Sequence, residues 1–572
     1  MWKYGLILFL LLLLFLVQPS AAQDFSSLKG QKAFSFHGSI GGGADFYHSN
    51  ESYLTRDPFA WNLYGNFTPA FYGLSLPFSF LINQYSRSYT SPFAQFGISP
   101  TYKWVKVHIG YRTISMSPLV FDGQSFLGAG IELSPKGFYL AAFYGRLNKA
   151  VTEDTTYGHT LAPQYQRTGY GVKIGVGGKV NNFSLQLFHA KDDSSSIRRP
   201  TDTLVSLAPQ ENTVLGASLH LRFFRKLTFS ADAATSLLTQ DQAFGVIDSI
   251  NNTKIPGLIK NIAPFNYSSV VSFAGQSNLT LLLRSFSSSI GYRRVQPDFK
   301  SLGTPYSLSD VEMIFGTVST SLDKGKVSLS ASLNSQHNDL SHMLSSELQT
   351  QTGNLSLNVF ANQHLNVSGN VTAVQVYQRN GVLALTDSVR MNQLMLSASL
   401  SPSLTFSGLT RQQTVSLSLN YTTLMDHNPA THTQTAGDNI TSSLAYSLFF
   451  SRAFWGLSGI LQYSQYTQPQ STYQSAGLNV GANAQLLKSH ALGVQGSVGY
   501  FLNHNSTTPA ANNTTFSLSG NYAVQQHHSL GVYTNYLITP PVNLNPLNTV
   551  NHVPYAVNSK NLAGGVTYAY HF

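Results

Sequence analysis

Hydrophobic and polar residues alternate with a period of two along most of the chain. Val415, Leu417 and Leu419 alternate with Ser416 and Ser418. The same alternation recurs in other segments, for example 354–359, 492–500 and 516–522. Because successive side chains of a strand point to opposite faces, this alternation predicts β-strands. No apolar run long enough for a membrane-spanning helix follows residue 22, so a helical membrane protein is excluded.

The polar face of these predicted strands is unusual because it carries Ser, Thr, Asn, Gln and Gly rather than Lys and Glu. Charged residues make up only 10% of the 572 residues, and no acidic residue follows Asp438. A water-soluble β-sandwich would place charged residues on its outward face. In a membrane barrel the apolar face meets lipid and the polar face lines a lumen. We therefore predict an all-β fold, a single closed antiparallel transmembrane β-barrel.

Connections between the predicted strands alternate between short and long. The short ones are 134–137, 177–179, 322–325, 452–454 and 488–490. The long, polar ones are 148–167, 191–211, 237–267, 297–309 and 539–560. Outer-membrane barrels have short periplasmic turns and long extracellular loops, which sets the expected orientation. The alternating segments number about 26, within a range of 22–26, and an even number places both termini in the periplasm.

The N-terminal residues predict export from the cytoplasm. Lys3 precedes an apolar run over 6–17, and Ser20, Ala21 and Ala22 form a small-residue cleavage site, as in a secretory signal peptide. We therefore expect a cleaved signal peptide (1–22), a short periplasmic lead (23–33) and a barrel (34–572). The chain has no cysteine, which excludes disulfides and Cys-ligated metals.

The chain ends in alternating aromatic residues, Tyr568, Tyr570 and Phe572. This terminus resembles the C-terminal insertion signal of bacterial outer-membrane barrels. The resemblance implies that the barrel assembly machinery recognises these three side chains. An aromatic girdle at the membrane interface is the physical counterpart of such a motif.

Two further segments, 123–130 and 292–303, resemble parts of large, mostly uncharacterised outer-membrane barrels of the Bacteroidota type. The resemblance implies the outer membrane of a Gram-negative bacterium of that type. Three Asp-Ser/Thr tripeptides in predicted loops resemble the O-glycosylation motif of the same phylum. They make Thr203, Ser249 and Ser388 candidate modification sites, although such pairs are also common in turns.

Several charged residues have the parity of the predicted lumen. Val105 and Val107 are expected to face lipid, and the residues between and beyond them then face inward. The candidate lumen-facing set is Lys106, His108, Arg112, Glu132, Lys173, Arg222 and Arg293. These residues either tune a pore electrostatically or solvate loops that fold inward, and the sequence leaves both roles open.

No residue pattern in the sequence indicates a metal site, a cofactor site, nucleic-acid binding or catalysis. The histidines lack the spacing and acidic neighbours of a metal site, and no cofactor motif or nucleic-acid-binding patch is present. We assign no catalytic residue and expect no enzyme. A membrane-embedded hydrolase would need a lumenal Ser-His-Asp or Ser-His-Asn cluster within hydrogen-bonding distance.

A closed barrel of 26 strands would be ~50 Å across, and residues 23–33 leave no room for a folded N-terminal plug. We therefore expect the lumen to be filled either by loops, first of all 237–267, or by another polypeptide. If loops fill it, carboxylates such as Asp241 and Asp248 should pair with inward cations. The first hypothesis is a passive or gated pore for a large polar substrate or a polypeptide. The alternative is a structural barrel that anchors, displays or helps export a secreted or surface partner protein. Lipid and the assembly machinery are the other expected partners.

Overall fold

A computed structural model describes residues 33–572 apart from several short segments. The segments outside the description are 51–56, 73, 85–94, 153–162, 179, 199–206, 248, 251–252, 255–263, 306–307, 387, 389, 488–489, 507, 525–526 and 540–558. The predicted signal peptide, the lead up to residue 32, Asp248 and the candidate modification site Thr203 therefore lie outside the described residues.

Strands make up almost all of the described chain. The strands before the longest connection are β1 (Phe34–Ser49), β2 (Phe59–Phe71), β3 (Leu74–Ser75), β4 (Phe78–Asn83), β5 (Gln95–Ile98), β6 (Thr101–Tyr102), β7 (Val105–Arg112), β8 (Phe126–Leu133), β9 (Phe138–Asn148), β10 (Gln166–Gly177), β11 (Asn182–Asp193), β12 (Glu211–Phe223) and β13 (Leu227–Thr239). The longest connection holds the small hairpin of β14 (Ser249–Ile250) and β15 (Thr253–Lys254).

The remaining strands follow in chain order. They are β16 (Ser269–Leu282), β17 (Phe286–Val295), β18 (Val311–Leu322), β19 (Val327–His337), β20 (Ser346–Phe360), β21 (Leu365–Asn380), β22 (Asn392–Ser407), β23 (Arg411–Asp426), β24 (Gly437–Phe450), β25 (Trp455–Gln468), β26 (Ser471–Leu486), β27 (Leu492–Asn505), β28 (Thr508–Val524), β29 (His528–Thr539) and β30 (Ser559–His571). Two short helical turns, η3 (Asp323–Gly325) and α3 (His432–Thr435), lie between strands. None of the helices in the described residues is long and apolar enough to cross a bilayer.

One sheet contains every strand except β14 and β15, and it closes on itself. Each strand pairs antiparallel with its neighbours along the chain, and β1 pairs with both β2 and β30. β3 and β4 both pair with β2, while β5 and β6 both pair with β7, so each of these pairs is one interrupted strand. The 28 segments of the sheet therefore form 28 − 2 = 26 strands. The predicted closed, all-β barrel of about 26 strands is confirmed.

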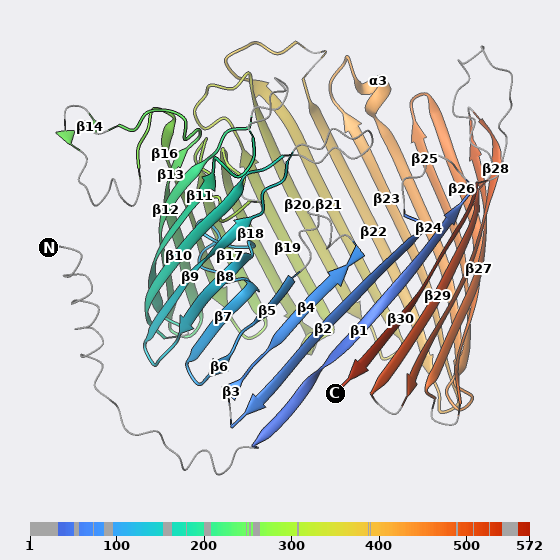
Figure 1. The fold of residues 1–572 in the computed structure, drawn as a ribbon. Helices are drawn as coiled ribbons and strands as arrows, with labels where there is room; N and C mark the ends of the chain where they lie inside the picture. The colour runs from blue at the N-terminus through green and yellow to red at the C-terminus, as the bar shows by residue number, and fades with distance from the viewer. Residues whose placement is uncertain are drawn as a thin grey trace.

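The two rims of the barrel differ. β1 begins and β30 ends at the rim where the connections are short, and this end is the short-turn rim (Figure 1). The long connections, including the hairpin β14–β15 and α3, lie at the opposite, long-loop rim (Figure 1). Two connections at the long-loop rim are nevertheless tight, because Gln468 pairs with Ser471 and Asn505 pairs with Thr508.

The outward face of the barrel is apolar. Leu355, Leu357, Val415 and Leu419 are exposed there, and Leu417 lies on the same face. Exposed leucine, valine and isoleucine side chains of this kind occur on nearly every strand. A soluble monomer rarely leaves so much contiguous apolar surface in water. A closed barrel with an apolar outward band is a membrane-spanning barrel, because lipid covers the band and closure pairs every strand edge.

The hydrophobic core lies inside the barrel, against one part of the lumen wall. It is built around two connections at the long-loop rim that fold inward, residues 113–125 and 296–304, which we call the inner segments. Leu119, Val120 and Phe121 of the first are fully buried, as are Phe299 and Leu302 of the second. They pack against lumen-facing apolar side chains of β8–β17, namely Phe126, Ala141, Phe143, Leu147, Phe188, Ala190, Val214, Ala234, Ala274 and Val295.

The expectation named 237–267 as the first segment to fill the lumen, whereas the described core is formed by the inner segments. Residues 248, 251–252 and 255–263 of the longer connection lie outside the described residues. The described part of the connection after β13 stays near the long-loop rim, where Phe244, Val246 and Tyr267 are exposed. The segment that folds inward is shorter and more apolar. Burying Leu119, Val120 and Phe121 is favourable, whereas a long polar loop gains little from leaving water.

Glycines on the lumen wall make room for the inner segments. A Cβ at Gly216 of β12 would lie 2.4 Å from Val120 Cγ2, and a Cβ at Gly171 of β10 would lie 2.7 Å from Met116 Cε. Gly303 sits directly on the ring of Phe121, where a Cβ would come within 2.6 Å. Gly216 and Gly171 form sockets, because any larger residue there would displace the first inner segment from the wall, while Gly303 lets the two inner segments pack together.

A charge on the apolar outward face should destabilise the barrel. We expect Leu419→Arg to lower the free energy of unfolding by about 2–4 kcal/mol if the position lies near the bilayer midplane. Asn420→Arg, one residue along and facing the lumen, is the matched control and should cost much less. Equilibrium unfolding by urea in lipid vesicles measures both variants. Equal destabilisation by the two substitutions would show that the facing is wrong.

Filling a glycine socket should release the first inner segment. With Gly216→Val we expect faster hydrogen exchange at the amides of Met116, Val120 and Phe121, which bond within the segment. Gly493→Val on β27 is the control, because a Cβ there would meet nothing closer than 3.8 Å. Amide exchange followed by mass spectrometry makes the measurement. Unchanged protection of 113–125 in Gly216→Val would contradict the socket.

Candidate functional site

Lys106, His108 and Glu132 lie together on the lumen side of β7 and β8. Lys106 stands opposite Glu132 in the strand register. The Glu132 carboxylate lies 3.2 Å from Lys106 Nζ and 2.7 Å from His108 Nε2, and it accepts a hydrogen bond from the Tyr139 hydroxyl at 2.8 Å. Three of the predicted lumen residues therefore meet in one cluster, which β9 completes with Tyr139.

The same cluster contains a serine. Ser99 Oγ lies 3.1 Å from His108 Nδ1, so a Ser-His-Glu arrangement is present in the geometry. A nucleophile must be reached by its substrate, yet Ser99 is only 6% exposed and His108 only 2%. Ser99, His108 and Glu132 thus form a buried polar network that ties the interrupted strand β5–β6 to β7 and β8.

Arg112 and Lys173 both donate hydrogen bonds to backbone carbonyls. Arg112 donates to Ser79 Oγ at 2.8 Å and to the carbonyl of Gly97, which connects β7 with β4 and β5. Lys173 Nζ donates to the carbonyl of Met116 at 2.6 Å. Lys173 therefore tethers the first inner segment through the backbone of that segment. The expected pairing of inward cations with loop carboxylates stays a prediction, since Asp248 lies outside the described residues.

A carboxylate of the wall provides the second tether. Asp232 of β13 accepts hydrogen bonds from Ser218 at 2.5 Å and from Gln276 at 3.0 Å, and Ser117 of the first inner segment approaches it at 3.4 Å. A half-buried charge is stabilised when its hydrogen-bonding capacity is satisfied in this way. Asp232 therefore holds the inner segment against β13.

The remaining predicted lumen residues lie apart from this cluster. Arg222 is exposed near the short-turn end of β12, on the lumen parity of Asn212. Arg293 of β17 is half-buried and shares the parity of the core residue Val295. The seven candidate residues therefore do not form a ring, because they all stand on strands between β7 and β17, on the side of the barrel where the inner segments lie.

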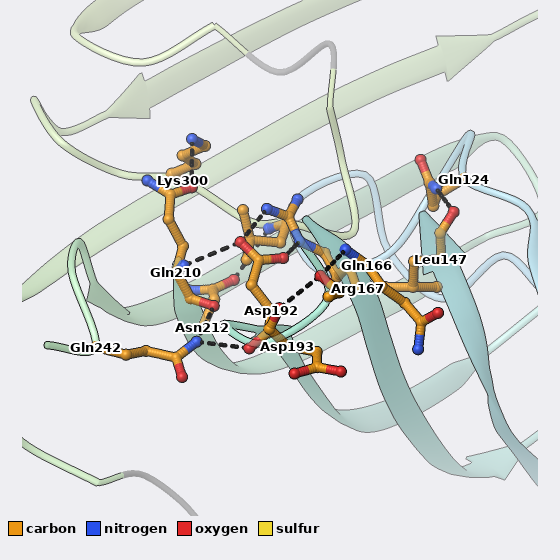
Figure 2. Close-up of polar contacts among 12 residues, drawn as sticks. Gln124, Leu147, Gln166, Arg167, Asp192, Asp193, Gln210, Asn212, Gln242 and Lys300 are labelled. Atoms are coloured by element: carbon orange, nitrogen blue, oxygen red, sulfur yellow. Dashed lines mark hydrogen bonds and ion pairs between the residues drawn. The ribbon is translucent and has the colours of Figure 1, made fainter. Parts of the chain in front are cut away.

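A buried ion pair stands at the long-loop rim. Arg167 of β10 binds the Asp192 carboxylate of β11 with two hydrogen bonds, of 2.7 and 3.0 Å, and Asp192 is almost completely buried. The backbone amide of Gln210 donates to the same carboxylate at 2.9 Å. Gln242 Nε2 donates to the carbonyls of Asp192 and Gln210, as Figure 2 shows. This network holds the connection after β13 against β11 and β12.

The second inner segment is held at the same place. Asn212 accepts from the amide of Leu302 at 3.0 Å, and Ser236 Oγ donates to the carbonyl of Lys300 at 2.6 Å. Lys300 Nζ donates to Gln210 Oε1 at 3.0 Å (Figure 2). Desolvation of the Lys300 ammonium by surrounding protein atoms, and next the positive Arg167, lowers its pKa, which the Asp192 carboxylate partly opposes. The two inner segments also bond to each other, from the amide of Asp122 to the carbonyl of Gly303.

The lumen side of β19–β29, which we call the neutral wall, contrasts with the side just described. Its residues are mainly Ser, Thr, Asn, Gln and Gly, as the paired positions Ser330–Ser356 and Asn420–Thr441 illustrate. Among its described lumen-facing residues, Asp426 is the one carboxylate, and it accepts from Thr431 and Thr435 at the long-loop rim. No described side chain from another part of the barrel packs over the neutral wall to form a core.

The C-terminal aromatic residues lie at the short-turn rim. Phe572 packs edge-on against Phe36, with ring centroids 4.6 Å apart, and against Tyr570 at 4.8 Å. Tyr568 OH lies 2.7 Å from His528 Nδ1. Recognition of these residues by the assembly machinery stays a prediction.

One candidate modification site has a described side chain. Ser388 is exposed in the connection after β21, and its hydroxyl lies 2.8 Å from Thr386 Oγ1. Ser249 belongs to β14, and nothing further is described of its side chain. Glycosylation of these positions stays a prediction.

Sequence reasoning missed the residues that hold the inner segments, including Asp232 and Lys300, and it also missed Asp192, which holds the connection after β13. A signal was available for the segments themselves. Leu119, Val120 and Phe121 are three consecutive apolar residues in a connection between strands, where an exposed loop would be polar. The wall partners could not be found, because identifying them requires the register of β10–β13.

No protein-family model matches the chain, and no curated protein matches it. OccAB2 of Acinetobacter baumannii is 11% identical, with a TM-score of 0.30 over 68% of this chain and 97% of that one. BauA, the ferric preacinetobactin receptor from Acinetobacter baumannii, is 9% identical, with a TM-score of 0.34 over 93% of this chain and 80% of that one. The P pilus usher (PapC) translocation pore is 10% identical, with a TM-score of 0.24 over 93% and 98%. Identities and TM-scores this low support no assignment of family or function.

Proposed function

We propose that the chain is an outer-membrane pore that conducts polar solutes along the neutral wall. The observation that carries the proposal is the division of the lumen into two sides. The inner segments fill the side of β8–β17, and the described residues leave the hydroxyl- and amide-lined side of β19–β29 uncovered. A polar solute that moves along such a wall exchanges hydrogen bonds with water for similar ones with protein.

The inner segments act in this proposal as a fixed filling that narrows the lumen. Glycine sockets, the tethers at Lys173 and Asp232, and the bond from Asp122 to Gly303 all hold them in place. A rigid filling suits a passive pore better than a mobile gate. The orientation with both termini in the periplasm belongs to the same proposal and follows the usual asymmetry of outer-membrane barrels.

The absence of cysteine in the chain allows a direct test. Single cysteines are introduced at Ser418, which faces the lumen, and at Leu419, which faces outward. A third cysteine replaces Val214, which lies under the first inner segment and is fully buried. We expect a negatively charged, water-soluble thiol reagent to modify Ser418→Cys rapidly in lipid vesicles, because water reaches the neutral wall. Modification should also reduce the ionic current in a planar bilayer.

Leu419→Cys and Val214→Cys are the matched controls and should react at least tenfold more slowly. Slow reaction of Ser418→Cys, or a barrel that passes no current, would contradict a pore along the neutral wall. Slow reaction together with a protein that co-purifies from native membranes would instead support the structural alternative, in which a partner fills this side of the lumen.

A further inference from the structure

A cavity of about 630 Å³ opens at the long-loop rim, directly above the second inner segment. Its walls come from the start of β12, the end of β13 and the connections that follow β13 and β17. Its lining includes Gln210, Gln240, Asp241, Phe244, Asp298 and Lys300. We call it the mouth cavity. Its volume falls in the range of small-molecule sites, about 300–1,000 Å³.

Hydrogen bonds fix the shape of the mouth cavity. The carbonyl of Asp241 accepts from Asn266 Nδ2 at 2.8 Å and from Ser268 Oγ at 3.0 Å, and its carboxylate accepts from the amide of Ala243 at 2.9 Å. The amide of Gln242 donates to the carbonyl of Pro209 at 3.0 Å. The tight turn that presents Phe244 is therefore anchored to β12 and β16. A preorganised wall lowers the entropic cost of binding.

Phe244 is the exceptional side chain of this cavity. Its ring is 54% exposed at a rim whose other lining groups are mostly polar. An aromatic face set among amide, carboxylate and ammonium groups suits a pyranose sugar. The C–H face of the sugar packs on the ring while its hydroxyls donate to carboxylates and accept from amides and ammonium.

The charges around the cavity disfavour anions. Asp241 and Asp298 repel an anion, while the single ammonium of Lys300 only partly offsets their attraction for a cation. Beyond the cavity, the described lumen-facing residues of the neutral wall include one carboxylate, Asp426 at the long-loop rim, so they provide no series of charges along which an ion could move. A neutral, hydroxyl-rich solute meets neither obstacle, and it finds donors and acceptors at both places.

We propose that the mouth cavity is a binding site for neutral oligosaccharides, with Phe244 as the stacking platform and Asp298 and Lys300 as hydrogen-bonding partners. The inference rests on the proposed function, since it names the substrate class that the pore takes up. The cavity captures the sugar at the long-loop rim, and the neutral wall conducts it onward.

Binding is tested separately from conduction. Saturation-transfer NMR is recorded on the full-length purified barrel in detergent with maltohexaose, isomaltohexaose and laminarihexaose, and with hexaglutamate and hexalysine as charged probes. We expect transfer to at least one neutral hexasaccharide and none to the charged peptides. Phe244→Ala should weaken saccharide binding at least tenfold, and Asp298→Asn should also weaken it.

Tyr267→Ala is the matched control. Tyr267 is an exposed aromatic residue in the same connection that does not line the cavity, so its removal should leave binding unchanged. Transfer to none of the saccharides, equal binding by Phe244→Ala and the parent, or preferential binding of a charged peptide would overturn the inference. Ionic current through the same preparation reports on the pore itself, so a barrel that conducts without binding sugar fails only the inference, and one that binds sugar without conducting fails only the proposed function.

Discussion

Pairing of every backbone N–H and C=O group in the hydrocarbon layer is the constraint on which the whole structure depends. Lipid offers no hydrogen-bonding partners, so an open sheet edge within the membrane costs several kcal/mol for each unpaired group. The pairing of β1 with β30 removes the two edges. Closure by 26 strands then creates a wide lumen. The inner segments fill one side of this lumen.

The inner segments pack inside the lumen through buried apolar side chains, as the core of a soluble protein does. Val120 and Phe121 are excluded from water on the inside of a barrel whose outside is apolar, so the strands on this side have apolar side chains on both faces. The charged residues gather around this internal core, where Lys173 and Asp232 bind the inner segment. The described lumen-facing residues of the neutral wall include a single carboxylate, Asp426, which binds Thr431 and Thr435 at the long-loop rim.

The outline of the fold could be predicted from the sequence because each strand carries its own evidence. The alternation around Val415 is sufficient to place β23 and its lipid face without knowledge of any neighbour. The period-two alternation likewise placed Lys106 and Glu132 on the lumen face of their strands. Their contact depends on the register between β7 and β8, which the alternation does not give. The identity of the filling could not be predicted in this way. Length favoured 237–267, whereas the segment at 113–125 folds inward because it is apolar and because Gly216 and Gly171 stand opposite it.

The central claim is that the lumen is filled on one side and open along the neutral wall on the other. Polymer exclusion in planar bilayers tests it most directly, since uncharged polyethylene glycols lower the conductance of a pore only when they are small enough to enter. The account predicts a measurable open-state conductance that small polymers reduce and large ones do not, with a larger size limit after 117–121 are replaced by a short glycine linker. A barrel that conducts no ions, or one whose size limit is the same with and without the inner segment, would contradict it.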